Sequence, residues 1–240
     1  MAFIHADRVQ DTSTSTGTGD LTLSGTAPTG YQSFNSGIGV GPQFTYCAYA
    51  GSEWEVGVTV LSGSTTLVRG GSQTVLASSN SGSAVSFSAG TKTVICTIAA
   101  NRLPMTAYLT ADVTYNNTTT LTSLSDLSIT VAAGGIYSVS GLLVGTRGGD
   151  SNTSHDFNGG TATVTNFYAT LQNPGGGNSA TALSTNIVSP FLGSSFSLLC
   201  FGMLYVNAGG TFIPRAAQYA GHASNTVFKV GSYMSLTRLN

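Results

Sequence analysis

The residues from Phe44 to Leu61, FTYCAYAGSEWEVGVTVL, decide how the first half of the chain folds. Side chains alternate in character on either side of Gly51-Ser52, and a period of two places each set on one face of a β-strand. The short break between the two runs predicts a β-hairpin. Trp54 is the only tryptophan, and an aromatic side chain of that size buries on the order of 150–250 Å². We therefore expect Phe44, Tyr46 and Trp54 to form the core of the first domain.

The chain is poor in charge. Only 7% of its 240 residues are charged, whereas roughly 25% is typical of soluble domains. This composition excludes disorder driven by charge repulsion and a nucleic-acid-binding surface, which needs clustered Lys and Arg. A formal net charge of −1 lets many identical copies sit close together without accumulating repulsion. We favour an assembly of repeated copies over the alternative, a secreted β-protein with a neutral polar coat.

No segment predicts a signal peptide or a membrane span. The first seven residues, MAFIHAD, have neither a basic start nor an apolar core. The most apolar run, 198–206, is far shorter than the roughly 18 residues that a span needs, and it predicts a buried strand. Cys47, Cys96 and Cys200 form neither a zinc pattern nor a disulfide framework. We expect buried thiols in a protein made in a reducing cytosol, with a Cys47–Cys96 bridge as the alternative.

Turn signals recur about every 8–12 residues in the first half, which is typical of an all-β sandwich or barrel. Pro104 then interrupts the strand pattern, and the composition shifts after it. We therefore expect a first domain of residues 1–100, a linker of residues 101–105 and a second domain of residues 106–240. The second half alternates strand-like runs with glycine-rich turns, which suits a jelly roll or a related sandwich. The predicted fold class is all-β, with two β-sandwich or jelly-roll domains.

Several short pieces of the first hundred residues stand in a fixed order. They are RVQDTS (8–13), GTG (17–19), GYQSF (30–34), YC (46–47), WEVG (54–57), VLASSN (75–80) and GTK (90–92). Their order and spacing resemble a module found near the start of tailed-bacteriophage virion proteins, the head fibres and tail fibres. The resemblance implies that this domain attaches to a virion, through the major capsid protein or through a tail or adaptor protein. The chain departs from the module at residues 70–73 and 98–100, so the resemblance does not select one attachment partner.

Two pieces of the second half carry a further resemblance. They are LSITV (127–131), which turns into IYSVSG (136–141), and the closing run GSYMSLTRL (231–239). They resemble the tumour-necrosis-factor-like jelly rolls that phages use as trimeric head domains. The resemblance implies a homotrimer that packs apolar strand faces about a threefold axis. The candidate residues for this face are Phe201, Leu204, Tyr205, Phe212 and Tyr219, and the alternative for each of them is the core of its own protomer.

The carboxylate pair Glu53 and Glu55 suggests an enzymatic function as one hypothesis. Glu53 and Glu55 are two residues apart on one strand face, roughly 6.5–7 Å from each other. This separation overlaps that of the two carboxylates in an inverting glycosidase, so a polysaccharide depolymerase is one hypothesis. We favour a solvated strand face opposite Trp54, because no third polar partner lies nearby in the sequence.

A second polar group lies between Arg147 and Gly160. Asp150, Asn152 and His155-Asp156 offer oxygen ligands at alternating positions, which suggests calcium. The spacing misses that of an EF-hand loop, however, and one loop supplies too few carboxylates for a tight site. We therefore favour a polar surface loop and predict no metal, no cofactor and no catalytic residue.

Together these observations predict a non-enzymatic virion protein that is made in the host bacterial cytoplasm and acts as a homotrimer. We expect a capsid decoration protein or a short head fibre, because no long repetitive shaft separates the two halves. The alternative is a short tail fibre that contacts a host surface glycan. Its contacts would come from the loops of residues 147–160 and 173–178.

Overall fold

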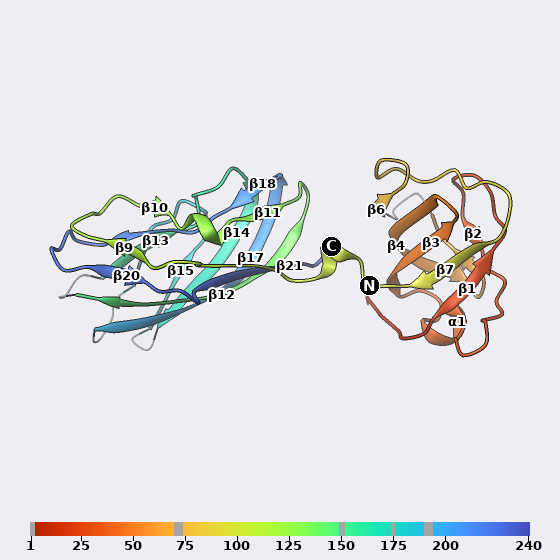
Figure 1. The fold of residues 1–240 in the computed structure, drawn as a ribbon, viewed down its shortest axis with the longest axis horizontal. Coiled ribbons are helices and arrows are strands. Elements are labelled where there is room, and N and C mark those ends of the chain that lie inside the picture. The colour runs from red at the N-terminus through yellow and green to blue at the C-terminus, as the bar shows by residue number, and fades with distance from the viewer. Residues whose placement is uncertain (1–2, 70–73, 149–151, 174–175, 190–193) are drawn as a thin grey trace. The chain divides into compact units, whose positions relative to one another are not determined.

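The computed structural model describes residues 3–69, 74–148, 152–173, 176–189 and 194–240. The chain is almost entirely β and divides into two compact units, Met1–Leu103 and Pro104–Asn240 (Figure 1). The prediction of an all-β protein is therefore confirmed. The division between the units lies within residues 101–105, the predicted linker. In the described ranges, no helix is long and apolar enough to cross a membrane.

Unit 1 is a rolled β-sheet with one short helix, α1 (Phe34–Gly37). Its strands are β1 (Gln10–Ser13), β2 (Leu21–Thr22), β3 (Gln43–Ala50), β4 (Glu53–Gly63), β5 (Thr66–Leu67), β6 (Thr74–Ser78) and β7 (Lys92–Cys96). They follow the order β1-β7-β3-β4-β5-β2, and β6 pairs with β4. A bridge between Ser13 and Leu23 links the two ends of this order, so the sheet curls back on itself. The predicted hairpin is β3–β4, in which Tyr49 opposes Trp54.

The core of unit 1 contains two of the three aromatic residues expected there. Phe44 and Tyr46 are buried, whereas the Trp54 side chain is 40% exposed, so its assignment to the core is wrong. The burial pattern of β4 explains why, because Glu55, Gly57 and Thr59 face inward. A two-residue period separates the faces of a strand, but it does not say which face is inside.

Unit 2 is a β-sandwich. Its longer strands are β12 (Ile136–Arg147), β14 (Thr163–Asn173) and β17 (Ser195–Ala208). Its shorter strands are β8 (Met105–Tyr108), β9 (Val113–Tyr115), β10 (Thr122–Ser123), β11 (Ile129–Val131), β13 (Thr153–Asp156), β15 (Gly176–Ala180), β16 (Ile187–Ser189), β18 (Gly210–Phe212), β19 (Arg215–Gln218), β20 (Thr226–Phe228) and β21 (Tyr233–Arg238). Two single 3-10 turns, Ala100–Arg102 and Ser125–Leu127, complete the regular structure of the described chain.

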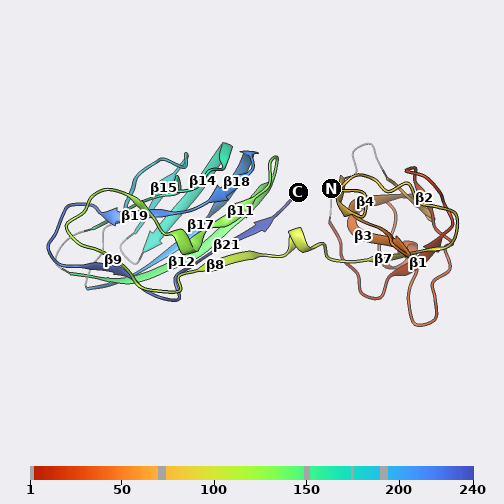
Figure 2. The same ribbon diagram turned by 45° about the horizontal axis from the view of Figure 1, so that its top comes forward.

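The strands of unit 2 form one large and two small sheets. The eight-stranded sheet has the order β15-β14-β17-β12-β20-β9, with β21 also paired to β12 and β8 paired to β21. Figure 2 shows β8 and β21 beside β12. A four-stranded sheet, β10-β19-β13-β16, and the pair β11-β18 supply the other strands. A single hydrophobic core contains residues from all three sheets, including Leu143, Ile187 and Phe212.

Phe212 fills this core. Its ring stacks on Phe157 with 5.6 Å between ring centroids, and Phe157 in turn packs on Phe167 at 5.1 Å. Phe212 is only 1% exposed. Its assignment to an interface between protomers is therefore wrong, because the side chain has no surface left to offer a second copy. Leu204 is buried in the same core.

The three cysteines are free thiols. Cys47 lies opposite Ile95 and Val56, while Cys96 lies opposite Tyr46. Directly opposed residues share a face and successive residues alternate, so Cys47 and Cys96 point to opposite faces of the sheet. The alternative of a bridge between them is wrong. Burial raises the pKa of the Cys200 thiol to about 12, so this side chain stays protonated at neutral pH.

The packing of unit 2 makes a prediction at Gly202, in the middle of β17. A Cβ atom on this residue would lie 2.0 Å from the backbone oxygen of Tyr168 on the neighbouring strand. We expect Gly202→Ala to lower the free energy of unfolding of unit 2 by about 1–3 kcal/mol, because the two central strands must move apart. Differential scanning calorimetry measures the change. Gly177→Ala on β15 is the matched control, because its Cβ would meet nothing closer than 3.4 Å, and equal effects of the two substitutions would contradict the prediction.

Candidate interaction surfaces

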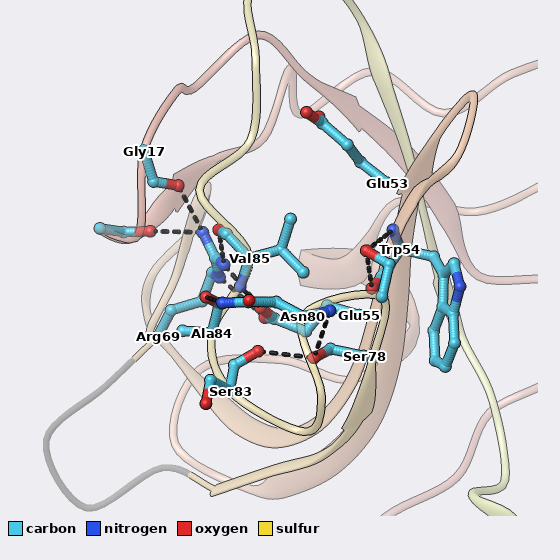
Figure 3. A network of polar contacts seen from close by, with 12 residues as sticks. Gly17, Glu53, Trp54, Glu55, Arg69, Ser78, Asn80, Ser83, Ala84 and Val85 are labelled. Carbon is cyan, nitrogen blue, oxygen red and sulfur yellow. Dashed lines mark hydrogen bonds and ion pairs between the residues drawn. The ribbon is translucent and has the colours of Figure 1, made fainter.

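A buried ion pair lies inside unit 1 (Figure 3). The Arg69 guanidinium holds the Glu55 carboxylate with two bonds, Nε to Oε1 at 2.8 Å and Nη2 to Oε2 at 2.6 Å. The Tyr46 hydroxyl also donates to Oε1, and the Val85 N–H donates to Oε2 at 2.7 Å. Both carboxylate oxygens therefore have two donors, and the charges of Glu55 and Arg69 compensate each other away from water.

Arg69 also ties together three segments that are far apart in the sequence. Its remaining N–H groups donate to the carbonyl oxygens of Gly17 at 3.2 Å, Gly19 at 3.0 Å and Val85 at 2.7 Å. The guanidinium carbon lies 5.0 Å from the centroid of the Phe87 ring. The backbone around Gly17 and Val85 is mostly irregular and lacks the regular hydrogen bonds of a sheet. The Arg69 side chain supplies hydrogen bonds that hold this backbone in place.

The cluster sets the charge states of its members. Burial alone would raise the pKa of Glu55, but the hydrogen bonds from Arg69, Tyr46 and the Val85 N–H outweigh burial and lower it. Burial, and then the bond to Glu55, raise the pKa of Tyr46. At neutral pH Glu55 is thus ionised and Tyr46 is protonated.

This arrangement corrects the interpretation of the carboxylate pair. Glu55 is buried and does not lie on a solvated face, while Glu53 bonds the N–H and hydroxyl of Ser88 at 2.9 and 2.6 Å. Figure 3 shows the indole of Trp54 pointing away from the cluster. Since all donors around Glu55 come from the protein itself, its carboxylate is not presented to a substrate.

The cluster predicts a large effect from removing one partner. We expect Arg69→Met to lower the free energy of unfolding of unit 1 by about 3–5 kcal/mol, because the Glu55 charge is left buried and unpaired. Since Trp54 is the only tryptophan and lies in unit 1, its fluorescence during urea unfolding reports this unit. The control is Lys229→Met in the exposed pair Lys229–Asp112, which should not change that transition. A stable Arg69→Met unit 1 would contradict the assigned role.

The outer surface of the eight-stranded sheet carries a broad apolar face, which we call the β17 face. Its large side chains come from β8, β12, β14, β17 and β21. On β17 they are Leu199, Phe201, Met203 and Tyr205, and on the neighbouring strands they are Tyr108, Leu142, Tyr168 and Tyr233. Tyr108 is 60% exposed, Tyr168 and Leu199 are 53% exposed and Phe201 is 47% exposed.

The register places these side chains in rows across the sheet. One row runs from Tyr108 through Tyr233 and Leu142 to Leu199 and Gln172. In the next rows Phe201 lies between Ser140 and Thr170, and Met203 lies between Ser138 and Tyr168. No Lys, Arg, Asp or Glu belongs to these rows. Because the side chains come from adjacent strands, the apolar groups form one continuous surface.

Two shallow hollows lie along β14 and β17. The first has a volume of about 230 Å³ and is lined by Tyr168, Ala169, Thr170, Ser179, Ala180, Thr181, Phe201, Gly202 and Met203. The second, about 280 Å³, is lined by Gln172, Asn173, Ser197 and Leu199. Both are large enough for a side chain from another molecule.

The structure separates the residues that the sequence grouped into one interface. Phe201 and Tyr205 do lie together on the β17 face, with Tyr205 half-buried. Tyr219 follows β19 in the four-stranded sheet and does not belong to this face. The sequence reasoning missed Tyr108, Tyr168 and Leu199, although β17 contained a signal. Its buried and exposed positions are both apolar, a pattern that is typical of a strand covered on both sides.

Two of the candidate metal-binding residues do not lie in a surface loop. His155 and Asp156 belong to β13, whose four residues are all buried, so that prediction is wrong. The His155 Nε2 lies 2.6 Å from the Thr153 hydroxyl, and its ring packs edge-on against Phe228. Asp156 is paired with Arg215 at 2.7 and 2.5 Å. Asp150 lies outside the described residues, and within them no group of three or more His, Cys, Asp or Glu is arranged to hold a metal.

The buried His155 predicts how the stability of unit 2 depends on pH. Burial lowers its pKa from 6.5 to about 3, and outweighs the opposing charge of Asp156. As the pH falls below about 6.5, the unfolded chain binds a proton that the folded unit excludes, so stability is lost by up to about 1.4 kcal/mol per pH unit. Glu55 has a lowered pKa, so unit 1 loses its contribution only below about pH 4.5, the ordinary value.

We therefore expect the calorimetric transition of unit 2 to move down between pH 6.5 and 5, while that of unit 1 stays in place. His155→Leu should flatten the response of unit 2 in this window. A unit 2 transition that is unchanged from pH 7 to 5 in the wild-type chain would contradict the assignment.

No protein-family model, curated protein or solved structure matches the chain. Its function therefore has to be inferred from its own residues and contacts.

Proposed function

We propose that the chain is a non-enzymatic structural protein of a phage virion and acts as a homotrimer. Unit 2 associates with its copies through the β17 face, and unit 1 attaches the trimer to the particle. The observation that carries this proposal is the uncharged, apolar β17 face.

The composition of the β17 face supports association between copies. Monomeric proteins rarely expose continuous apolar patches larger than a few hundred Å², and larger ones mark interaction sites. Interface cores are enriched in aromatic residues and Met and depleted of Lys, Glu and Asp, as the rows through Leu199, Phe201 and Met203 are. An uncharged surface meets its own copy without repulsion. The count of three copies follows the resemblance of residues 127–141 and 231–239 to trimeric jelly rolls.

The attachment role of unit 1 rests on the order of motifs in the first hundred residues. Within the predicted hairpin, Phe44 and Tyr46 are buried and support the fold. Trp54 and the opposing Tyr49 are both exposed, so they are the part of the hairpin that is available to the shell. The short linker favours a capsid decoration protein or a short head fibre. Three free thiols suit synthesis in the host bacterial cytoplasm.

Sedimentation equilibrium tests the oligomeric state. We expect a mass of about three times the 24.4 kDa of one chain. Phe201→Glu should shift the protein towards monomers at micromolar concentration, because a trimer would have to bury three added charges without partners. Val40→Glu introduces the same charge at an exposed position of unit 1 and should leave the trimer intact. A monomeric wild-type chain would refute the proposed assembly.

Particle composition tests the virion assignment. We expect mass spectrometry of purified particles to find the protein in mature virions, at a constant ratio to the major capsid protein. Substitution of Trp54 by Ala should reduce this ratio if unit 1 attaches through its exposed hairpin, while Val40→Ala should not. Absence of the wild-type protein from purified particles would refute the virion assignment, even if the chain is trimeric.

A further inference from the structure

Two loops and Asn152 meet at one end of unit 2. The chain enters this unit at Met105, which pairs with Leu236, and that region lies at the Ile136 end of β12. At the other end of β12, Arg147 pairs with Thr226, and Thr226 in turn pairs with Tyr115. Residues 116–118, 219–225 and Asn152 gather here, at the end marked by β9 and β20 in Figure 1. We call this group of residues the tip.

A single buried side chain holds the tip loops together. Gln218 is fully buried, and its Oε1 accepts hydrogen bonds from the N–H groups of Thr118 and His222, each at 3.2 Å. Its Nε2 donates to the Ser224 carbonyl at 2.9 Å and to the Thr226 hydroxyl at 3.4 Å. These four bonds use the two lone pairs and both N–H groups of the amide. The loops are thus fixed before any ligand arrives, which lowers the entropic cost of binding.

The Asn116 side chain ties two of the loops together. It donates through Nδ2 to the Ala223 carbonyl at 2.6 Å and to the Asn225 Oδ1 at 2.7 Å. Asn117 adopts a left-handed backbone with φ of +46°, and its N–H donates to the His222 carbonyl. Gly221 packs so closely that a Cβ there would lie 2.8 Å from the Asn117 Oδ1. The tip therefore holds its asparagine side chains in a defined arrangement.

One aromatic ring stands at this fixed end. The backbone N–H of Tyr219 donates to the Asn152 carbonyl at 2.8 Å, and its side chain is 55% exposed. The exposed side chains around it include Asn116, Asn117 and Asn225. None of the described residues that make up the tip is Lys, Arg, Asp or Glu. The half-buried Arg147 lies at the margin, and it has interactions of its own within the protein.

We propose that the tip is a binding site for a neutral saccharide. A sugar offers a C–H face that packs on an aromatic ring and hydroxyl groups that each donate and accept. Tyr219 supplies the ring. The Asn117 amide supplies donors and an acceptor together, whereas Asn116 supplies its Oδ1 alone, because both of its N–H groups are bonded within the tip. The described residues of the tip include no Lys or Arg that could pair with an anionic sugar. Tyr219 is the one large exposed ring among them, which is little for a protein partner. One ring and a few amides give weak binding per copy, which several copies strengthen through avidity.

This site goes beyond the proposed structural role and does not depend on it. The tip belongs to the loops at one end of unit 2, whereas the β17 face is the outer surface of the eight-stranded sheet. One copy suffices to form the tip. The site also differs from the glycan-binding loops expected from the sequence, because Asp156 is buried and paired with Arg215. Residues 220–225, which the sequence did not single out, contribute instead, together with Tyr219, which the sequence analysis assigned to the trimer interface.

An array of immobilised oligosaccharides tests the inference, with neutral hexose and N-acetylhexosamine chains beside sialylated ones. We expect the full-length protein to bind a subset of the neutral chains. Tyr219→Ala should reduce that signal about tenfold or more, and Tyr219→Phe, which keeps the ring, should retain it within about threefold. Val40→Ala is the control, because Val40 is a comparably exposed residue of unit 1 that belongs to no proposed binding surface, and it should bind like the wild type.

The remaining outcomes overturn the inference. The first is that the protein binds no neutral chain, and the second is that it binds sialylated chains alone. The third is that the Tyr219→Ala signal equals that of Val40→Ala. Calorimetry of each variant verifies that unit 2 is folded. The oligomeric state is measured on the same samples, so a monomeric chain that binds sugar would refute the proposed trimer and leave the saccharide site standing.

Discussion

Strand β17 has apolar side chains on both of its faces, so both faces need to be covered from water. The inward set, including Leu198, Cys200 and Leu204, is covered by the second layer of the sandwich. The outward set, including Leu199 and Phe201, has no cover within unit 2. A strand of this composition is normally buried on both faces. In the proposed homotrimer, a second copy of an equally uncharged surface would supply the missing cover without bringing like charges together.

The chain has few charged side chains, and several of them are buried inside unit 1. Glu55 and Arg69 are buried in unit 1, and so are Asp11 and Lys92. Lys92 donates to the carbonyl oxygens of Ser88 and Gly90, each at 2.7 Å. Burying a charge costs desolvation energy that only well-placed hydrogen bonds offset. In unit 1 these bonds order irregular segments, and they leave few charges for the outer surface, where Asp7, Arg8 and Asp20 are exposed.

The local sequence pattern predicted where the strands and the joint between the units lie better than it predicted which side chains are buried. The alternation from Phe44 to Leu61 located the β3–β4 hairpin, and Pro104 located the joint between the units. The same alternation led to the wrong prediction that Trp54 is buried and Glu55 is exposed. The pattern contains no information about Arg69, which lies 14 residues away in the sequence and neutralises Glu55. His155 and Asp156 lie in a short polar strand, where tertiary packing overrides weak strand propensity. The tip was out of reach of any local pattern, since Gln218 binds Thr118 across 100 residues.

The central claim is that the β17 face is covered in the assembled protein. Hydroxyl-radical footprinting with mass spectrometry tests it most directly, because the oxidation rate of a side chain follows its exposure to solvent. Tyr168 on the β17 face and Tyr49 on unit 1 are similarly exposed in one copy, at 53% and 43%. If sister copies cover the face, Tyr168, Leu199 and Met203 will be protected in the purified protein while Tyr49 is oxidised readily. Oxidation of Tyr168 as fast as that of Tyr49 would contradict the account.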